Sequence, residues 1–238
     1  GVDRILDAHD TDLADGHRKV FAILLAGMAD AMPADLRSDA WVIRQNALRL
    51  LAALSEFLDR FAGPRAANLA CRVEARVEHG VSREAVALTA IDGVGSGRAE
   101  RLANAGLTAP AAVVDAGSEA LAGAGMSDSV AERIVEAARE CPRIDVEWGE
   151  FPDAIAAGEN RLCEVGVVAA GGGARVGIRV TVNDVEMTAR TAYLDGKTTV
   201  PVGVFGPPDE ETLRFVVEVA FPDLPLLPVR ATRTVRVT

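Results

Sequence analysis

Residues 91–106 read IDGVGSGRAERLANAG, and this stretch decides the fold of the middle of the chain. An apolar residue, a Gly-x-Gly triplet and a helix that opens with an alanine form the pattern of a tight helical hairpin. Gly93 and Gly95 flank Val94, so the backbone is free to take a positive φ or to approach a neighbour closely. Such a turn exposes backbone N–H groups at the N-terminus of its second helix, where a phosphate binds favourably.

The side chains around this turn fit the phosphate contact of a helix-hairpin-helix motif. Ser96 is a small polar residue suited to the start of a helix, and two arginines follow within reach of a nucleic-acid backbone. The sequence therefore predicts a nucleic-acid contact made by Gly93, Gly95, Ser96, Gly97, Arg98 and Arg101. The alternative is a helical hairpin whose glycines serve packing alone.

A second copy of the pattern follows at residues 121–138, LAGAGMSDSVAERIVEAA. Gly123 and Gly125 align with Gly93 and Gly95 at an offset of 30, whereas the two Ala-Glu-Arg triplets lie 32 residues apart. We therefore expect two extra residues in the second turn. Internal repetition of this kind indicates two like units packed together.

The second hairpin differs from the first in charge. In this alignment Asp128 stands where the first hairpin has Arg98, so we expect a structural role for the second copy. Pro110 is suited to the first turn of a helix that connects the two units. Residues 88–143 thus form a predicted tandem helix-hairpin-helix domain.

Residues 1–87 have helical periodicity and form a predicted helical bundle. We expect Ser38 to cap the second helix, Pro64 to open the third and Gly80 to end it. The three apolar-periodic stretches cover residues 13–32, 38–61 and 64–81.

An arginine stripe runs along the third of these helices. Arg65, Arg72 and Arg76 fall within about 40° of one another at 100° per residue. Arg72 and Arg76 are further candidates for contact with a nucleic-acid backbone. The stripe is equally consistent with a solvated face that pairs with Glu74 and Glu78.

From residue 144 the period changes to the strict alternation of β-strands. The alternating stretches are 144–151, 161–170, 174–184, 185–195, 198–206, 212–221 and 229–237. Short strands separated by turn residues over residues 144–238 predict a β-sandwich of the immunoglobulin or fibronectin type III kind. The Gly-Gly-Gly run at 171–173 lies between two strands, so we expect a hairpin turn there and no phosphate loop.

The charge of the chain limits how it could contact a polyanion. The formal net charge is −10, which argues against a general basic surface for nucleic acid. Only Lys19 and Lys197 are lysines among 25 basic side chains. This bias resembles that of proteins from salt-loving archaea. Binding would then depend on amide geometry, hydrogen bonds and stacking.

The cysteines and the hydropathy suggest a compartment. Cys71, Cys141 and Cys163 are odd in number and far apart, which predicts a reducing environment without disulfides or zinc. No run of about 18 apolar residues is present, so no membrane span is expected, and no signal peptide is recognised. We expect a cytoplasmic protein. Because the chain begins with glycine, we expect either a fragment of a longer chain or a processed chain.

No catalytic motif was found. The sequence contains neither a GxxxxGK[ST] phosphate loop nor a GxSxG nucleophile turn. His9, His17 and His79 have no metal-ligand spacing. We therefore predict no catalytic residue, no metal site and no cofactor in this chain.

The order of helical bundle, helix-hairpin-helix and β-sandwich resembles the C-terminal region of Ski-type superfamily-two helicases. The most specific match is RVEHGVSREAVALTAIDGVGSGRAERLANAGL at residues 76–107. Asp35-Leu36 and Trp41 also stand where that family has similar residues. The resemblance implies a ratchet-like bundle that guides single-stranded or branched DNA. It also implies that ATP and Mg belong to motor domains outside this chain.

This chain departs from the family at one functional position. The family's ratchet helix ends in a Trp-Ile pair that stacks on the strand, whereas Gly27-Met28 stands there in this chain. Two hypotheses follow. The chain is either a nucleic-acid-binding accessory region of a helicase, for DNA or RNA, or a protein-interaction scaffold whose sandwich docks a partner.

Overall fold

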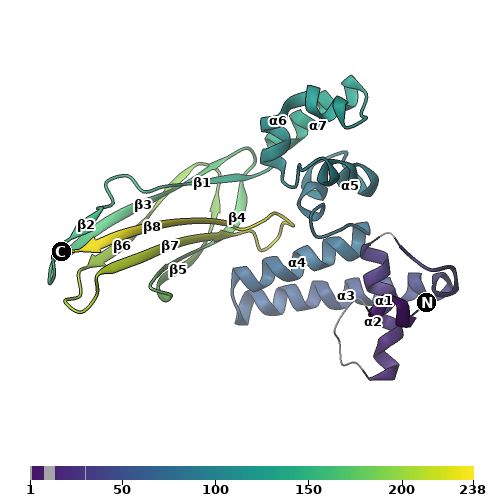
Figure 1. Ribbon diagram of the computed structural model, residues 1–238, viewed down its shortest axis with the longest axis horizontal. Coiled ribbons are helices and arrows are strands. Elements are labelled where there is room, and N and C mark those ends of the chain that lie inside the picture. Colours follow the sequence, from purple (N-terminus) through teal and green to yellow (C-terminus); the bar gives the residue numbers. More distant parts are fainter. Residues whose placement is uncertain (1, 8–13, 30) are drawn as a thin grey trace.

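A helical half and a β-sandwich make up the chain, as Figure 1 shows. The computed structural model describes residues 2–7, 14–29 and 31–238, and His9 lies outside this range. The helices are α1 (Val2–Leu6), α2 (Asp15–Met28), η1 (Ala34–Leu36), α3 (Arg37–Phe61), α4 (Pro64–His79), η2 (Val86–Ala90), α5 (Ser96–Asn104), α6 (Pro110–Gly123) and α7 (Asp128–Glu140). The predicted fold class, helical bundle then tandem hairpins then sandwich, is confirmed.

The helical bundle is built around the antiparallel pair α3 and α4. Pro64 opens α4, and Gly80 ends it in the left-handed conformation with φ of 65°, as the sequence predicts. The predicted cap at Ser38 is wrong, because the 3-10 turn η1 runs directly into α3 and makes Leu36 the N-cap. The Ser38 hydroxyl lies 3.4 Å from the Asp39 carboxylate instead.

Helix α3 has an unusual surface for a helix of 25 residues, since none of them is fully buried. Leu50, Leu54, Phe57 and Phe61 recur at helical spacing and are all exposed. The rings of Phe57 and Phe61 lie 4.6 Å apart. Helix α4 packs on the face of α3 that includes Ser55, so this apolar stripe lies outside the contact between the two helices.

The tandem hairpins share one core. Residues from both units pack together, among them Leu88, Leu102, Leu121 and Ile134. The same core also includes side chains from before residue 88, such as Val81. Helix α6 is broken at Gly117, whose φ is 74°, and the two shorter helical pieces wrap over α7.

The sandwich contains every strand that alternation predicts and one short strand more. Its strands are β1 (Arg143–Glu147), β2 (Ala154–Ile155), β3 (Asn160–Ala170), β4 (Ala174–Val182), β5 (Val185–Leu194), β6 (Lys197–Phe205), β7 (Thr212–Ala220) and β8 (Val229–Val237). One sheet has the order β1-β3-β6 and the other β2-β8-β7-β4-β5. Between them the rings of Phe151 and Phe215 meet edge-to-face at 4.9 Å.

The glycine run at 171–173 is not a hairpin turn, contrary to the sequence prediction. Strand β3 pairs with β1 and β6, whereas β4 pairs with β5 and β7, so the run crosses from one sheet to the other. The crossing packs against the end of α7, where the Gly172 N–H donates to the Glu140 carbonyl at 2.7 Å. A Cβ on Gly171 would lie 2.3 Å from the Cys141 carbonyl oxygen, so only glycine fits.

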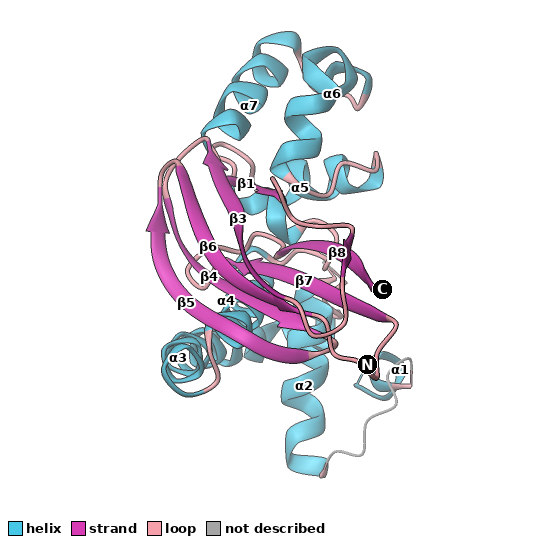
Figure 2. Ribbon diagram, turned by 90° about the vertical axis from the view of Figure 1, so that its left-hand side faces the viewer, coloured by secondary structure: helices cyan, strands magenta, loops and turns pink. Residues whose placement is uncertain are grey.

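Helix α4 joins the bundle to the sandwich (Figures 1 and 2). The buried Asn68 amide donates to the carbonyls of Phe221, Leu224 and Leu226 at 2.7, 3.1 and 3.0 Å. Pro64 packs directly on Gly177 of β4. The helices are therefore held to the sheet by specific contacts at the N-terminal end of α4.

Candidate nucleic-acid interface

The loop of the first hairpin, formed by η2, residues 91–95 and α5, presents free backbone donors. Gly93 has a φ of 76°, which glycine adopts readily, and Val94 is buried below the loop. Gly95 is the N-cap of α5, and its carbonyl accepts the N–H groups of Arg98 and Ala99. Within the described residues, the N–H groups of Gly95, Ser96 and Gly97 have no acceptor. All three residues are exposed.

The arginines of this hairpin brace its loops. Arg98 donates from Nη1 to the Gly93 carbonyl at 2.7 Å, and Arg101 donates to the Gly125 carbonyl in the second loop at 3.1 Å. A guanidinium carries five donors, so each arginine has donors left for a phosphate. Arg98 therefore holds the loop that presents the free amides, whereas Arg101 holds the loop of the second hairpin.

The second hairpin, formed by α6, residues 124–127 and α7, has the same loop in a register different from the predicted one. Gly125 has a φ of 84°, like Gly93, and the Ser127 carbonyl accepts the N–H groups of Val130 and Ala131. The offset between the hairpins is therefore 32 residues, and the expected two extra residues do not exist. Gly125 matches Gly93, because only the glycine in the left-handed conformation is equivalent.

This register makes Asp128 the counterpart of Ser96 rather than of Arg98. Asp128 is the first residue of α7 and is exposed, so its carboxylate lies at the positive end of that helix. A carboxylate in this place satisfies the helix dipole and repels a phosphate. The first turn of α5 therefore has no carboxylate, whereas the first turn of α7 has one.

The arginine stripe on α4 divides in the structure. Arg65 lies 3.5 Å from Glu218 of the sandwich, away from the hairpins. Arg72 and Arg76 lie within electrostatic reach of Arg83, which follows α4 in the turn before η2. Arg76 donates to the Val81 carbonyl at 3.4 Å, which folds this turn back onto α4. Sequence reasoning missed Arg83, since a single arginine in a turn has no periodicity to mark it.

The end of helix α2 offers no stacking surface. Met28 is buried, and the Gly27 carbonyl lies 3.1 Å from where a Cβ on Gly80 would stand. An aromatic residue is exposed nearby on α3, where the Trp41 side chain is 69% exposed. Trp41 lines a hollow of about 390 Å³ with neighbours that include Met32, Arg37, Arg44, Val77 and His79.

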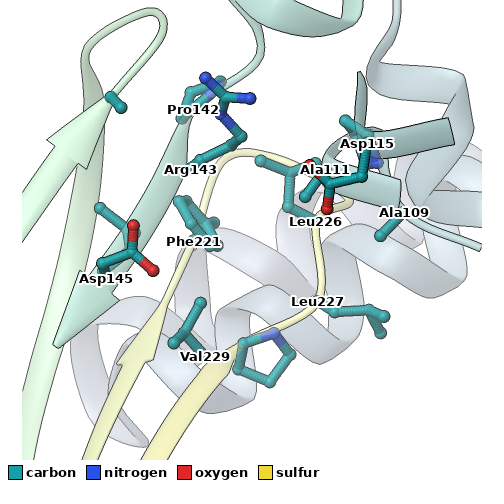
Figure 3. A pocket seen from close by; sticks show the side chains of 14 residues that line it. Ala109, Ala111, Asp115, Pro142, Arg143, Asp145, Phe221, Leu226, Leu227 and Val229 are labelled. Atoms are coloured by element: carbon teal, nitrogen blue, oxygen red, sulfur yellow. The ribbon is translucent and has the colours of Figure 1, made fainter. Parts of the chain in front are cut away.

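A second hollow lies between the hairpin domain and the sandwich. Figure 3 shows it where α6, β1 and the connection between β7 and β8 meet, and its volume is about 400 Å³. Phe221, Leu226 and Leu227 supply an apolar wall, while Asp115 and Arg143 stand at its side. The hollow therefore lies at the junction of these two domains.

Chemistry-bearing groups are sparse in the described part of the chain. No group of three or more His, Cys, Asp or Glu residues there could hold a metal ion. Burial, helped by Glu74 and Asp223, raises the pKa of Cys71 to about 11, so this thiol stays protonated at neutral pH. No helix among the described residues is both long and apolar enough to cross a membrane.

Comparisons with known proteins show a similarity in the hairpin segment and in the β-sandwich. No curated protein matches the chain. The crystal structure of the CARDB domain of a Pyrococcus furiosus protein in complex with di-metal ions is 23% identical, covering 41% of this chain and 89% of that domain with a TM-score of 0.35. A solution structure of the same domain is 24% identical and covers 42% of this chain and 97% of that domain, with a TM-score of 0.36. The SAM-like helix-hairpin-helix tandem family matches residues 85–140, from η2 to the end of α7.

Proposed function

We propose that this chain is a non-catalytic nucleic-acid-binding region that holds a strand by its backbone phosphates. The observation that carries the proposal is the N-terminus of α5, where three exposed N–H groups lack an acceptor among the described residues. The segment around them matches a helix-hairpin-helix tandem family. Backbone amides at the positive end of a helix are suited to a phosphate oxygen.

The charge of the chain supports a contact of few groups. With a net charge of −10, the surface as a whole repels a polyanion. Attraction then has to come from the amides of the first hairpin and from the arginines beside them. Such a contact positions a strand without reading its bases.

A guiding role within an ATP-dependent helicase is the more specific form of this proposal. Its support is the resemblance of residues 76–107 to Ski-type superfamily-two helicases, together with the order of the three parts. In that role the strand is single-stranded or branched DNA, and ATP and Mg act on motor domains outside this chain. The affinity for a labelled oligonucleotide, measured once with DNA and once with RNA, distinguishes the two nucleic acids.

The sharpest test places a carboxylate on the free amides. Ser96→Asp gives the first hairpin the acidic residue that the second already has at position 128. An acidic residue in the first turn stabilises a helix by about 0.3–1 kcal/mol, so folding is kept while a phosphate is repelled. We expect the affinity for a labelled single-stranded oligonucleotide, measured by fluorescence anisotropy, to fall at least tenfold.

The matched control is Ser129→Asp, which adds the same charge to the exposed first turn of α7. It should change the affinity less than twofold. Equal losses in both variants would show that the added charge acts through the whole molecule and not at the α5 amides. Replacing Arg98 or Arg101 is less informative, because both also hold loop carbonyls.

A second candidate function is docking of a protein on the sandwich. The favouring observation is an apolar pair on the outer face of the three-stranded sheet. Leu162 is 76% and Phe205 51% exposed, on neighbouring strands β3 and β6. If a partner docks there, Leu162→Glu should abolish its capture by the full chain and leave oligonucleotide binding unchanged.

A further inference from the structure

Three arginines meet where α4 ends and the first hairpin begins. Arg72 and Arg76 are four residues apart and share one face of α4, while Arg83 lies in the turn before η2. Burial lowers the pKa of Arg72, and the charges of Arg83 and Arg76 lower it further. Burial likewise lowers the pKa of Arg76, with Arg83 adding to the effect and Glu84 opposing it.

These guanidinium groups lack partners of opposite charge. Among the described residues, none of the three forms an ion pair within 4.0 Å. The Arg72 Nε atom is buried and has no hydrogen-bond partner there. Glu84 and Glu100 are the carboxylates whose charge reaches Arg76, and Ser82 already donates to Glu100.

Grouped like charges with a buried, unpaired donor raise the free energy of a folded chain. Four arginines elsewhere in the molecule, Arg139, Arg161, Arg179 and Arg214, each pair with a carboxylate instead. A bound anion would supply the missing partner for the group on α4.

We propose that Arg72, Arg76 and Arg83 form an anion site that takes a further phosphate of the strand held by the first hairpin. This inference rests on the proposed function. Glu100 contacts Ser82 beside the arginines, and Ser96 lies one turn earlier on the same face of α5. Four helical residues rise about 6 Å, so Ser96, the first residue of α5, and Glu100, the carboxylate beside the arginines, stand about that far apart along the helix.

The test uses the full chain, a labelled single-stranded oligonucleotide and a series of salt concentrations. The variant Arg72→Ala/Arg83→Ala removes two guanidinium groups and leaves Arg76, which supports the Val81 carbonyl. We expect the affinity at low salt to fall about tenfold. The slope of log K against log salt should shrink by about 0.7, the share of one phosphate on a single strand.

The control variant is Arg236→Ala, an exposed arginine on β8 whose side chain contacts no acceptor in the described part of the molecule. Its slope should equal that of the wild type. A double variant that keeps both the affinity and the slope overturns the inference. If Ser96→Asp abolishes binding in the same assay, the proposed function stands without it.

A measurement without nucleic acid separates the two proposals further. Inorganic phosphate should raise the melting temperature of the wild type more than that of Arg72→Ala/Arg83→Ala, because the variant keeps the α5 amides but has lost the arginine site. If phosphate stabilises both proteins equally, the arginine site is overturned. If phosphate stabilises the wild type more than the variant but no oligonucleotide binds, the strand is not the occupant, and both the strand assignment and the proposed function fail.

Discussion

Glu100 of α5 accepts two hydrogen bonds from Ser82, one from its backbone N–H and one from its hydroxyl at 3.0 Å. The same hydroxyl accepts the N–H of Ala85 at 3.3 Å, just before η2 begins. The Glu100 carboxylate therefore joins the turn before η2 to the middle of α5. The loop with the free amides lies between these two fixed points.

Glu100→Ala should lower the melting temperature by several degrees. It leaves the partly buried N–H of Ser82 without an acceptor, which costs about 1–3 kcal/mol. Each kcal/mol shifts the melting temperature of a chain of this size by roughly 2–4 °C. Circular dichroism during heating measures the shift. Glu132→Ala changes the equivalent exposed glutamate of the second hairpin, and an equal loss there would contradict the role of the Ser82 contact.

Gly177→Ala should loosen the attachment of the bundle to the sandwich. A Cβ at Gly177 would stand 2.2 Å from the Pro64 Cβ, so α4 has to move away from β4. Overpacking of this kind costs about 1–3 kcal/mol. Gly203→Ala on β6 is the control, because no heavy atom lies within 4 Å of its added Cβ. Thermal unfolding should separate the two variants, and equal melting temperatures would contradict the close packing of Pro64.

The same attachment should weaken in acid. Arg175 binds Asp223 through two hydrogen bonds of 2.7 Å and Asp59 through one of 2.8 Å. The hydrogen bonds to Arg175 hold the pKa of Asp223 below its ordinary value of 3.8. Because the pKa is lower in the folded state, the stabilisation is complete above about pH 4 and disappears as the pH falls through the folded value.

Asp223→Asn removes this titration. The difference in melting temperature between the wild type and this variant should therefore be present at about pH 6 and shrink steadily below about pH 4. Other carboxylates titrate equally in both proteins and cancel in the comparison. If the difference in melting temperature stays constant down to about pH 2, the charge of the Asp223 carboxylate does not contribute to stability, and the prediction is wrong.

The sequence predicted the first hairpin well because each of its two glycines is required for its own physical reason. Gly93 needs a positive φ and Gly95 serves as a helix cap. In the second hairpin these needs fall on Gly125 and Ser127, while Gly123 merely ends α6. Spacing of glycines could not show which one takes the left-handed conformation. The Ala-Glu-Arg triplets, which lie inside helices, gave the correct offset.

Alternation located the strands but not their partners. A period of two shows which side chains face the core, and it is the same whether two consecutive strands pair or lie in opposite sheets. The true hairpin at Asn183-Asp184 has φ values of 46° and 66°, the left-handed pair that such turns require. The glycine run at 171–173 is needed because the end of α7 packs closely against it. This is a tertiary contact, so the local sequence pattern could not reveal it.

Trp41 gives a spectroscopic test of contact between the bundle and a strand. Stacking of a base on an exposed indole should quench its fluorescence. Trp148 is half-buried against Phe151 in the sandwich, so Trp148→Phe leaves Trp41 as the only tryptophan. We expect quenching of this variant by a single-stranded oligonucleotide, and a loss of five- to hundredfold in affinity for Trp41→Ala.

Tyr193→Ala is the matched control for Trp41→Ala, since both side chains are 69% exposed and Tyr193 lies on β5 of the sandwich. It should leave the affinity unchanged. Unaltered Trp41 fluorescence at saturating oligonucleotide would confine the strand to the hairpins and the arginines next to them.

Asp128→Ser should turn the second hairpin into a second phosphate contact. The loops of the two hairpins have equivalent backbone bonds, with Gly95 and Ser127 as N-caps, and they differ at the first helical residue. Removal of the carboxylate frees the positive end of α7. The affinity for an oligonucleotide should rise severalfold, and the salt slope should grow by about 0.7.

The gain has to depend on position 128 and not on the lost charge alone. Glu132→Ala removes one negative charge from the same helix one turn later, where no free amide is exposed, and it serves as the control. If both variants bind equally more tightly, net charge explains the gain. If Asp128→Ser alone gains affinity and slope, the pair of hairpins differs in function through one side chain, because the backbone that cradles the phosphate is already present in both.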